Sequence, residues 1–275
     1  MRDIISTAYL MGGIGNQLFQ ISHALCQGFK YNIPVKFKPF SYTPMQGLQP
    51  SLYFDNIFRN IEFSNITQPL KRVEGTFHFS NSEFSWDTSI EFYGYYQSSK
   101  YFLGFDEKLK EIFKPTQEFK DKIERIYPGF LNSNSLSLHI RRGDYLNISN
   151  ILPVIDISYI NESINQIGNY DNLYIFTQDK EWAINNLNYN NMIIVDNLEF
   201  DYEELWMISL CKNNIMSNSS FSWWGSFLNQ NVNKKVMVPN IWFGPGSDYN
   251  YSDIYESYHT KINVKFLNGK LIYEG

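Results

Sequence analysis

Cysteine and histidine are scarce in this sequence. The chain of 275 residues holds two cysteines, Cys26 and Cys211, and four histidines. Both cysteines stand in apolar helical surroundings, so we expect small buried side chains rather than a disulfide. The histidines show no spacing typical of metal ligands. These shortages argue against a disulfide-stapled protein and a zinc protein, and we expect neither a metal nor a cofactor.

The chain also lacks an excess of positive charge and a long hydrophobic run. Its net charge of -5 argues against a nucleic-acid-binding protein, which needs an extended basic surface. A small anionic ligand needs only a few arginines and stays open. The N-terminal stretch 1–5 is too short for a signal or transmembrane segment. We therefore expect a cytoplasmic protein without a transmembrane segment, and leave peripheral membrane association and oligomeric state open.

Aromatic residues, by contrast, are plentiful, at 17% of the chain. They either fill the core or line a groove, because aromatic faces stack well on sugars and bases.

Strand-like and helix-like segments alternate along the sequence, which is typical of an α/β fold. The clearest strands are 4–10, 136–140, 173–176, 192–195 and 236–238, and the section from 32 to 101 is irregular. A Pro128-Gly129 turn and the polar run 132–135 predict a hinge. We therefore divide the chain into an N-terminal acceptor-side domain, 1–130, and a C-terminal domain, 131–275, with a ligand cleft between them.

The first candidate site is the loop GGIGNQ, residues 12–17, between a predicted strand and a predicted helix. Its glycines permit close backbone approach, and a helix start offers N–H groups to an anion. The loop is not a dinucleotide fingerprint, because the last glycine of that pattern is missing. The glycines could equally form only a tight turn, but the amides of Asn16 and Gln17 suit a polar ligand.

The second candidate site follows the alternating run 136–140, which we interpret as a half-buried strand. His139, Arg141, Arg142 and Asp144 lie at its exit, where ligands bind in open α/β sheets. If the chain stays extended, His139 and Arg141 share one side and reach an anion, whereas Arg142 pairs with Asp144. The alternative is a solvated surface salt bridge.

The third candidate site is the segment NSSFSWWG, residues 218–225, at another strand-to-helix junction. Serines at a helix start are ordinary N-caps, but Ser219, Ser220 and the backbone at Phe221 also suit a pyrophosphate. For Trp223 and Trp224 we favour packing over ligand stacking.

Together the three segments resemble the α-1,2-fucosyltransferase family, glycosyltransferase family 11, over nearly the whole chain. The resemblance is carried by MGGIGNQLFQ (11–20), HIRRGDY (139–145) and NSSFSWWG (218–225), with weaker similarity at FYGYYQ (92–97) and FTQDKEW (176–182).

The resemblance implies a GT-B fold with two Rossmann-like halves facing across a cleft. It implies transfer of fucose from GDP-β-L-fucose, with inversion and without a metal, to the 2-hydroxyl of a terminal β-galactoside in a glycan. The catalytic residues would be Arg141, His139 and Asn16. The donor would be held by the residues Gly13, Asn16, His139, Arg141, Asp179, Ser219, Ser220 and Phe221. The guanine contact falls on either Gln178 or Asp179.

Three questions stay open at this point. The general base is unassigned among Asp144, Asp156, His23 and Glu91. The chemistry could involve a different sugar or linkage. A non-catalytic carbohydrate-binding or adhesive protein, using its aromatics and the Arg-Gly-Asp tripeptide, is the alternative from a different class.

Overall fold

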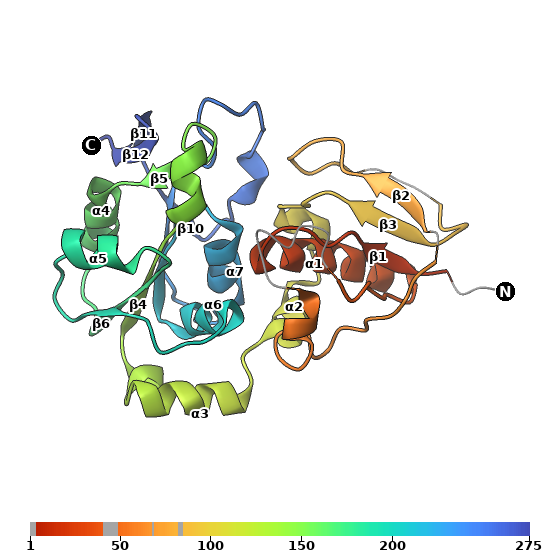
Figure 1. The fold of residues 1–275 in the computed structure, drawn as a ribbon, viewed down its shortest axis with the longest axis horizontal. Coiled ribbons are helices and arrows are strands. Elements are labelled where there is room, and N and C mark those ends of the chain that lie inside the picture. The colour runs from red at the N-terminus through yellow and green to blue at the C-terminus, as the bar shows by residue number, and fades with distance from the viewer. Residues whose placement is uncertain (1–3, 41–48, 68, 82–84) are drawn as a thin grey trace. The chain divides into compact units, whose positions relative to one another are not determined.

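The structure is a computed structural model and describes residues 4–40, 49–67, 69–81 and 85–275. The chain forms two compact units (Figure 1). Unit 1 comprises Met1–Lys114 and Tyr249–Glu256, and unit 2 comprises Pro115–Asp248 and Ser257–Gly275. This division lies before the predicted boundary at 130/131, and the chain returns to unit 1 near its end. Residues 1–3 of the N-terminal stretch 1–5 lie outside the described residues. Part of the irregular section 32–101 lies outside them as well.

Unit 1 is built on a parallel sheet of order β1-β3-β2. Its strands are β1 (Ser6–Ala8), β2 (Leu70–Val73) and β3 (Ile90–Tyr93), and its helices are α1 (Ile14–Tyr31), α2 (Asp106–Phe113) and the 3₁₀ helices η2 (Pro50–Tyr53), η3 (Ser99–Phe102) and η6 (Ser252–Ile254). The side chains of Leu18, Ile21 and Leu25 are buried, as their helical spacing predicts. The hydroxyl of Ser6 on β1 donates to the carbonyl of Ala24 at 2.8 Å, which ties α1 to the sheet.

Unit 2 is a Rossmann-like layer structure around a six-stranded parallel sheet of order β10-β9-β8-β4-β6-β7. Its strands are β4 (Ser135–Ile140), β6 (Asn172–Thr177), β7 (Met192–Ile194), β8 (Asn213–Ile215), β9 (Val236–Pro239) and β10 (His259–Ile262). Its helices are α3 (Gln117–Ile126), α4 (Ile157–Ile167), α5 (Lys180–Asn186), α6 (Asp201–Leu210), α7 (Ser220–Leu228) and the 3₁₀ helices η4 (Phe130–Asn132) and η5 (Gly143–Ile148). A small sheet of order β11-β12-β5 completes it, from β11 (Val264–Leu267), β12 (Lys270–Tyr273) and β5 (Val154–Ile155).

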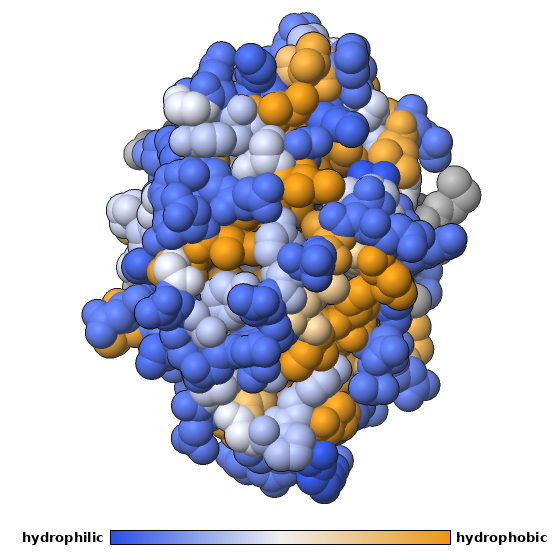
Figure 2. Space-filling model, turned by 90° about the vertical axis from the view of Figure 1, so that its left-hand side faces the viewer, coloured by the Kyte–Doolittle hydropathy of each residue, from blue (hydrophilic) through white to orange (hydrophobic). Residues whose placement is uncertain are grey.

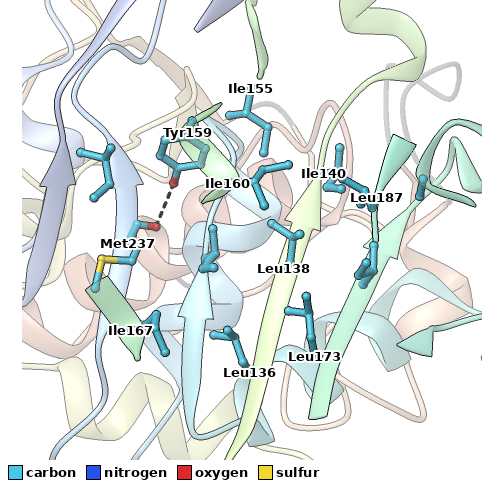
Figure 3. Close-up of a cluster of buried hydrophobic side chains, with 14 of the residues drawn as sticks. Leu136, Leu138, Ile140, Ile155, Tyr159, Ile160, Ile167, Leu173, Leu187 and Met237 are labelled. Atoms are coloured by element: carbon cyan, nitrogen blue, oxygen red, sulfur yellow. Dashed lines mark hydrogen bonds between the residues drawn. The ribbon is translucent and has the colours of Figure 1, made fainter. Parts of the chain in front are cut away.

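Strand β4 lies in the middle of the six-stranded sheet of unit 2. Leu136, Leu138 and Ile140 share one face, as the period-two pattern predicts, and pack with α4 side chains such as Tyr159 and Ile160 (Figure 3). The expectation of a half-buried strand is wrong, because all six residues of β4 are buried. The opposite face is covered as well, so a central parallel strand has no wet side.

Polar and apolar residues both lie on the surface of the molecule. Polar residues cover most of the face drawn in Figure 2, and apolar side chains reach it in several groups, as is normal for a folded protein. Among the described residues, no helix is both long and apolar enough to cross a membrane.

Candidate functional site

The carboxyl edge of the unit 2 sheet gathers most of the predicted site. Strands β4, β6 and β8 are parallel neighbours, so the loops that follow them leave the sheet at one edge. The loop after β4 carries Arg141, the loop after β6 carries Gln178 and Asp179, and the loop after β8 leads into α7. Such an edge is where α/β sheets bind ligands.

Arg141 is held by groups from two of these loops. Its Nη2 lies 2.8 Å from Asp144 Oδ1, and its Nη1 donates to Gln178 Oε1 at 3.3 Å. The expected pair between Arg142 and Asp144 is therefore wrong. The reason is local: Arg142 has φ -125° and ψ -101°, so the extended backbone does not continue past β4. The guanidinium of Arg141 is preoriented and a quarter of its side chain is exposed.

Arg142 instead joins the loops after β4 and β6. Its Nε lies 2.9 Å from Asp179 Oδ2, and its guanidinium lies 4.2 Å from the ring centre of Trp182. Asp179 also caps α5, because its Oδ1 accepts from the Trp182 N–H at 3.2 Å. The Asp179 carboxylate is thus shared between two structural contacts.

His139 is buried at the end of β4. Its Nδ1 lies 3.0 Å from the hydroxyl of Ser217, and its ring packs 5.1 Å from that of Phe221. Burial, with a smaller contribution from Arg141, lowers the pKa of His139 to about 3. The imidazole is therefore neutral at physiological pH, and the positive charge beside it comes from Arg141 and Arg142, each paired with a carboxylate.

The start of α7 supplies a further polar surface. The Ser219 hydroxyl accepts from the Phe221 N–H at 3.3 Å as the N-cap of this helix. Trp223 and Trp224 are fully buried, which confirms packing rather than stacking on a ligand. Ser217, one residue before the predicted segment 218–225, is the hydrogen-bond partner of His139.

Unit 1 places the glycine loop at the start of α1. Gly13 is the N-cap residue of α1, and Gly12 has a positive φ of 76°. Two buried glutamines fasten this loop. Gln17 donates to the Gly12 carbonyl at 3.0 Å, and the Gln20 amide bonds both the N–H and the carbonyl of Met11, at 3.0 and 3.3 Å. The sequence offered the Gln17 amide to a polar ligand, whereas the buried side chain donates to the loop's own backbone. Gln20 entered only as part of the motif.

Asn16 has a partner that the sequence did not reveal. Gln97 donates from its Nε2 to Asn16 Oδ1 at 2.7 Å. The sequence pointed to Gln97 only as the last residue of segment 92–97, which is weakly similar to the family.

The four candidates for the general base each have a structural contact. Asp144 pairs with Arg141, and Asp156 caps α4 by accepting from the Ser158 N–H at 3.0 Å. Glu91 lies 2.7 Å from Lys38. His23 is buried and its pKa is lowered to about 3 by desolvation. In the described part of the chain, no three His, Cys, Asp or Glu side chains gather as metal ligands would.

Comparison with known proteins decides the family. The model of the family described as "Glycosyl transferase family 11" matches residues 9–256. The chain belongs to glycosyltransferase family 11. It is 31% identical over 278 aligned residues to an α-1,2-colitosyltransferase of Escherichia coli, covering 87% of this chain and 92% of that protein.

Two solved structures support the fold assignment for this family 11 member. The fucosyltransferase NodZ from Bradyrhizobium matches with a TM-score of 0.50 at 8% identity, over 83% of this chain and 93% of that one. POFUT1 in complex with GDP matches with a TM-score of 0.50 at 12% identity, over 87% and 99%. The protein is a glycosyltransferase with an α/β fold of the GT-B class.

Proposed function

We propose that this family 11 enzyme transfers L-fucose from GDP-β-L-fucose to the 2-hydroxyl of a terminal β-galactoside in a glycan. We propose further that it does so with inversion and without a metal. The observation that carries the proposal is the preoriented Arg141 beside neutral His139 and the start of α7, at the carboxyl edge of β4 and β8.

Charge development explains why this arrangement suits the reaction. As the bond between the sugar and the phosphate breaks, negative charge grows on the leaving GDP. Fixed donors that are oriented before the reaction stabilise that charge without reorganising. In our proposal Arg141 contacts the pyrophosphate, and Ser219, Ser220 and the backbone at Phe221 add neutral donors. His139 acts as an uncharged polar group, because burial disfavours its protonated form.

The remaining donor contacts are assigned by the same reasoning. We propose that Asn16 and Gly13 of unit 1 contact the sugar or phosphate. Asp179 is the weaker candidate for a guanine contact, because its carboxylate already serves Arg142 and the cap of α5. Gln178, whose Oε1 accepts from Arg141, is the alternative.

A second candidate keeps the chemistry and changes the sugar. Identity of 31% to an α-1,2-colitosyltransferase over most of both chains favours a colitosyl donor as the alternative to a fucosyl donor.

The test is a donor-hydrolysis assay with GDP-fucose, GDP-colitose, GDP-mannose and UDP-galactose, which needs no knowledge of the acceptor. We expect hydrolysis of GDP-fucose and raised thermal stability with GDP. Arg141→Ala should lower kcat/KM by about 100-fold or more, the scale expected for a lost transition-state donor. Arg125→Ala, on an exposed arginine of α3, is the matched control and should be unchanged. Preference for GDP-colitose would favour the second candidate, and no stabilisation by millimolar GDP would refute both.

A further inference from the structure

Glu74 directs its carboxylate at the backbone of a turn in unit 1. It follows strand β2, and its Oε2 accepts from the N–H groups of Tyr95 at 2.8 Å and Tyr96 at 2.9 Å. Its Oε1 accepts from the hydroxyl of Tyr101 at 3.4 Å. Because one oxygen accepts from two successive N–H groups, Glu74 clamps these two residues of the turn.

Gly94 makes room for that clamp. A Cβ on Gly94 would lie 2.3 Å from the Glu74 Cβ and 2.6 Å from its Oε2. Any side chain at position 94 would therefore displace the carboxylate.

The clamped residue Tyr96 adopts an unusual backbone conformation. Its φ is +52°, in the left-handed region that aromatic residues rarely occupy. Its ring stacks on His23, with centroids 4.0 Å apart and planes 5° from parallel. Such a conformation persists only where the surroundings enforce it, and here Glu74 and His23 do so.

The residue after Tyr96, Gln97, links the clamped turn to the candidate site. Gln97 is 8% exposed and donates to Asn16 Oδ1 at 2.7 Å. Asn16 and His23 lie seven residues, or about two turns, apart on one face of α1. The turn therefore contacts α1 at two points, through Tyr96 at His23 and through Gln97 at Asn16.

This contact also orients the Asn16 amide. Because Oδ1 accepts from Gln97, Nδ2 is turned to Gly12, where a Cβ on that glycine would lie only 2.5 Å from it. Loss of the Gln97 bond would let the amide rotate away from the glycine loop.

We propose that Glu74 is a positioning residue for sugar transfer, which acts through the turn 95–97 to hold the amide of Asn16 at the glycine loop. The inference rests on the proposed function, in which Asn16 contacts the donor. Glu74 itself need not touch the substrate.

The kinetic test compares Glu74→Ala, Glu74→Gln and Gly94→Ala with the wild type in the full chain. We expect Glu74→Ala and Gly94→Ala to lower kcat on GDP-fucose by about tenfold or more, since small misplacements of reacting groups are costly. Glu74→Gln should stay within about threefold, because its amide oxygen can accept the same two N–H groups. The affinity for GDP should be unchanged in all three. Glu62→Ala, which removes the exposed carboxylate paired with Lys36, is the control.

A double variant separates positioning from a general structural effect. If Glu74 acts through Gln97, Glu74→Ala should cost less than about twofold in kcat in a Gln97→Ala background, because residues that act as a unit are not additive. Full additivity, or a Glu74→Ala variant no different from Glu62→Ala, would overturn the proposal.

Hydrogen exchange keeps this test separate from the proposed function. Peptides covering 94–98 should exchange faster in Glu74→Ala and in Gly94→Ala than in the wild type and Glu62→Ala. Unchanged exchange would refute the clamp even if the enzyme were active. A wild type that turns over no GDP-sugar would refute the proposed function while the exchange result still decides the clamp.

Discussion

The carboxyl of Glu74 makes the stability of this protein depend on pH in a measurable way. Burial raises the pKa of Glu74 to about 7 from 4.5, against the opposing hydrogen bonds from Tyr96, Tyr95 and Tyr101. Between these two values the folded chain holds a proton that the unfolded chain releases. The stability from this group is therefore fully present below about pH 4.5 and is lost as the pH rises through about 7. At about 1.36 kcal/mol per pH unit, the difference amounts to about 3 kcal/mol.

The variant Glu74→Gln isolates this contribution. The free energy of unfolding in urea is measured for both proteins from about pH 4 to about pH 8.5, and the two values are subtracted at each pH. The contributions of all other titrating groups cancel in the subtraction. As the pH rises across that range, the unfolding free energy of the variant should therefore increase by about 3 kcal/mol relative to that of the wild type. A difference that stays constant within about 0.5 kcal/mol would show that the Glu74 carboxyl titrates as it does in the unfolded chain, and the reasoning about its burial would fail.

Three further substitutions test contacts in unit 2. Tyr159→Phe removes a buried hydroxyl that lies 2.7 Å from the Met216 carbonyl, and should lower the unfolding free energy by about 1–3 kcal/mol; an unchanged melting temperature would contradict this. Arg142→Ala removes the bridge between the loops after β4 and β6; if these loops hold the donor as proposed, the KM for GDP-fucose should rise about tenfold, the equivalent of about 1.4 kcal/mol, with a smaller effect on kcat. Asp144→Asn removes the negative charge beside Arg141, so affinity for GDP should rise a few-fold at low salt while kcat falls; a fall in both would count against Asp144 as a purely orienting partner.

The elements around the site could be predicted because their signals are local. Leu136, Leu138 and Ile140 alternate within five residues, and a parallel sheet then places the ends of its strands at one edge. The side of β4 that faces the core follows from this pattern alone. Its burial on both faces does not, because the period-two pattern does not report what covers the other side.

The choice of ion-pair partners could not be predicted from the sequence. The expected pairing assumed an extended chain beyond Ile140, whereas Arg142 and Gly143, with φ of 37°, turn the backbone. That turn sends Arg141 to Asp144 and leaves Arg142 for Asp179. The sequence alone does not distinguish the two possible pairings of these arginines with these carboxylates, because the backbone conformation decides between them.

The unit boundary and the Glu74 clamp depend on contacts between distant parts of the chain. Helix α3 belongs to unit 2, where the Phe119 ring packs 5.2 Å from that of Trp206; a Pro-Gly turn near residue 129 gives no hint of this. Strand β2 is short and exposed along its length, so no alternation marks it or draws attention to Glu74 at its end.

The return of Tyr249–Glu256 to unit 1 has a consequence for how the protein is made. Asp253, in this segment, accepts from the Phe79 N–H at 3.0 Å and pairs with Lys100, so unit 1 is incomplete until the chain has been synthesised as far as Glu256. Domains usually fold in order as they leave the ribosome, but here the N-terminal unit must wait for a segment that follows most of unit 2. A fragment that stops at Lys114 would lack its own last piece, and no single cut yields both units whole.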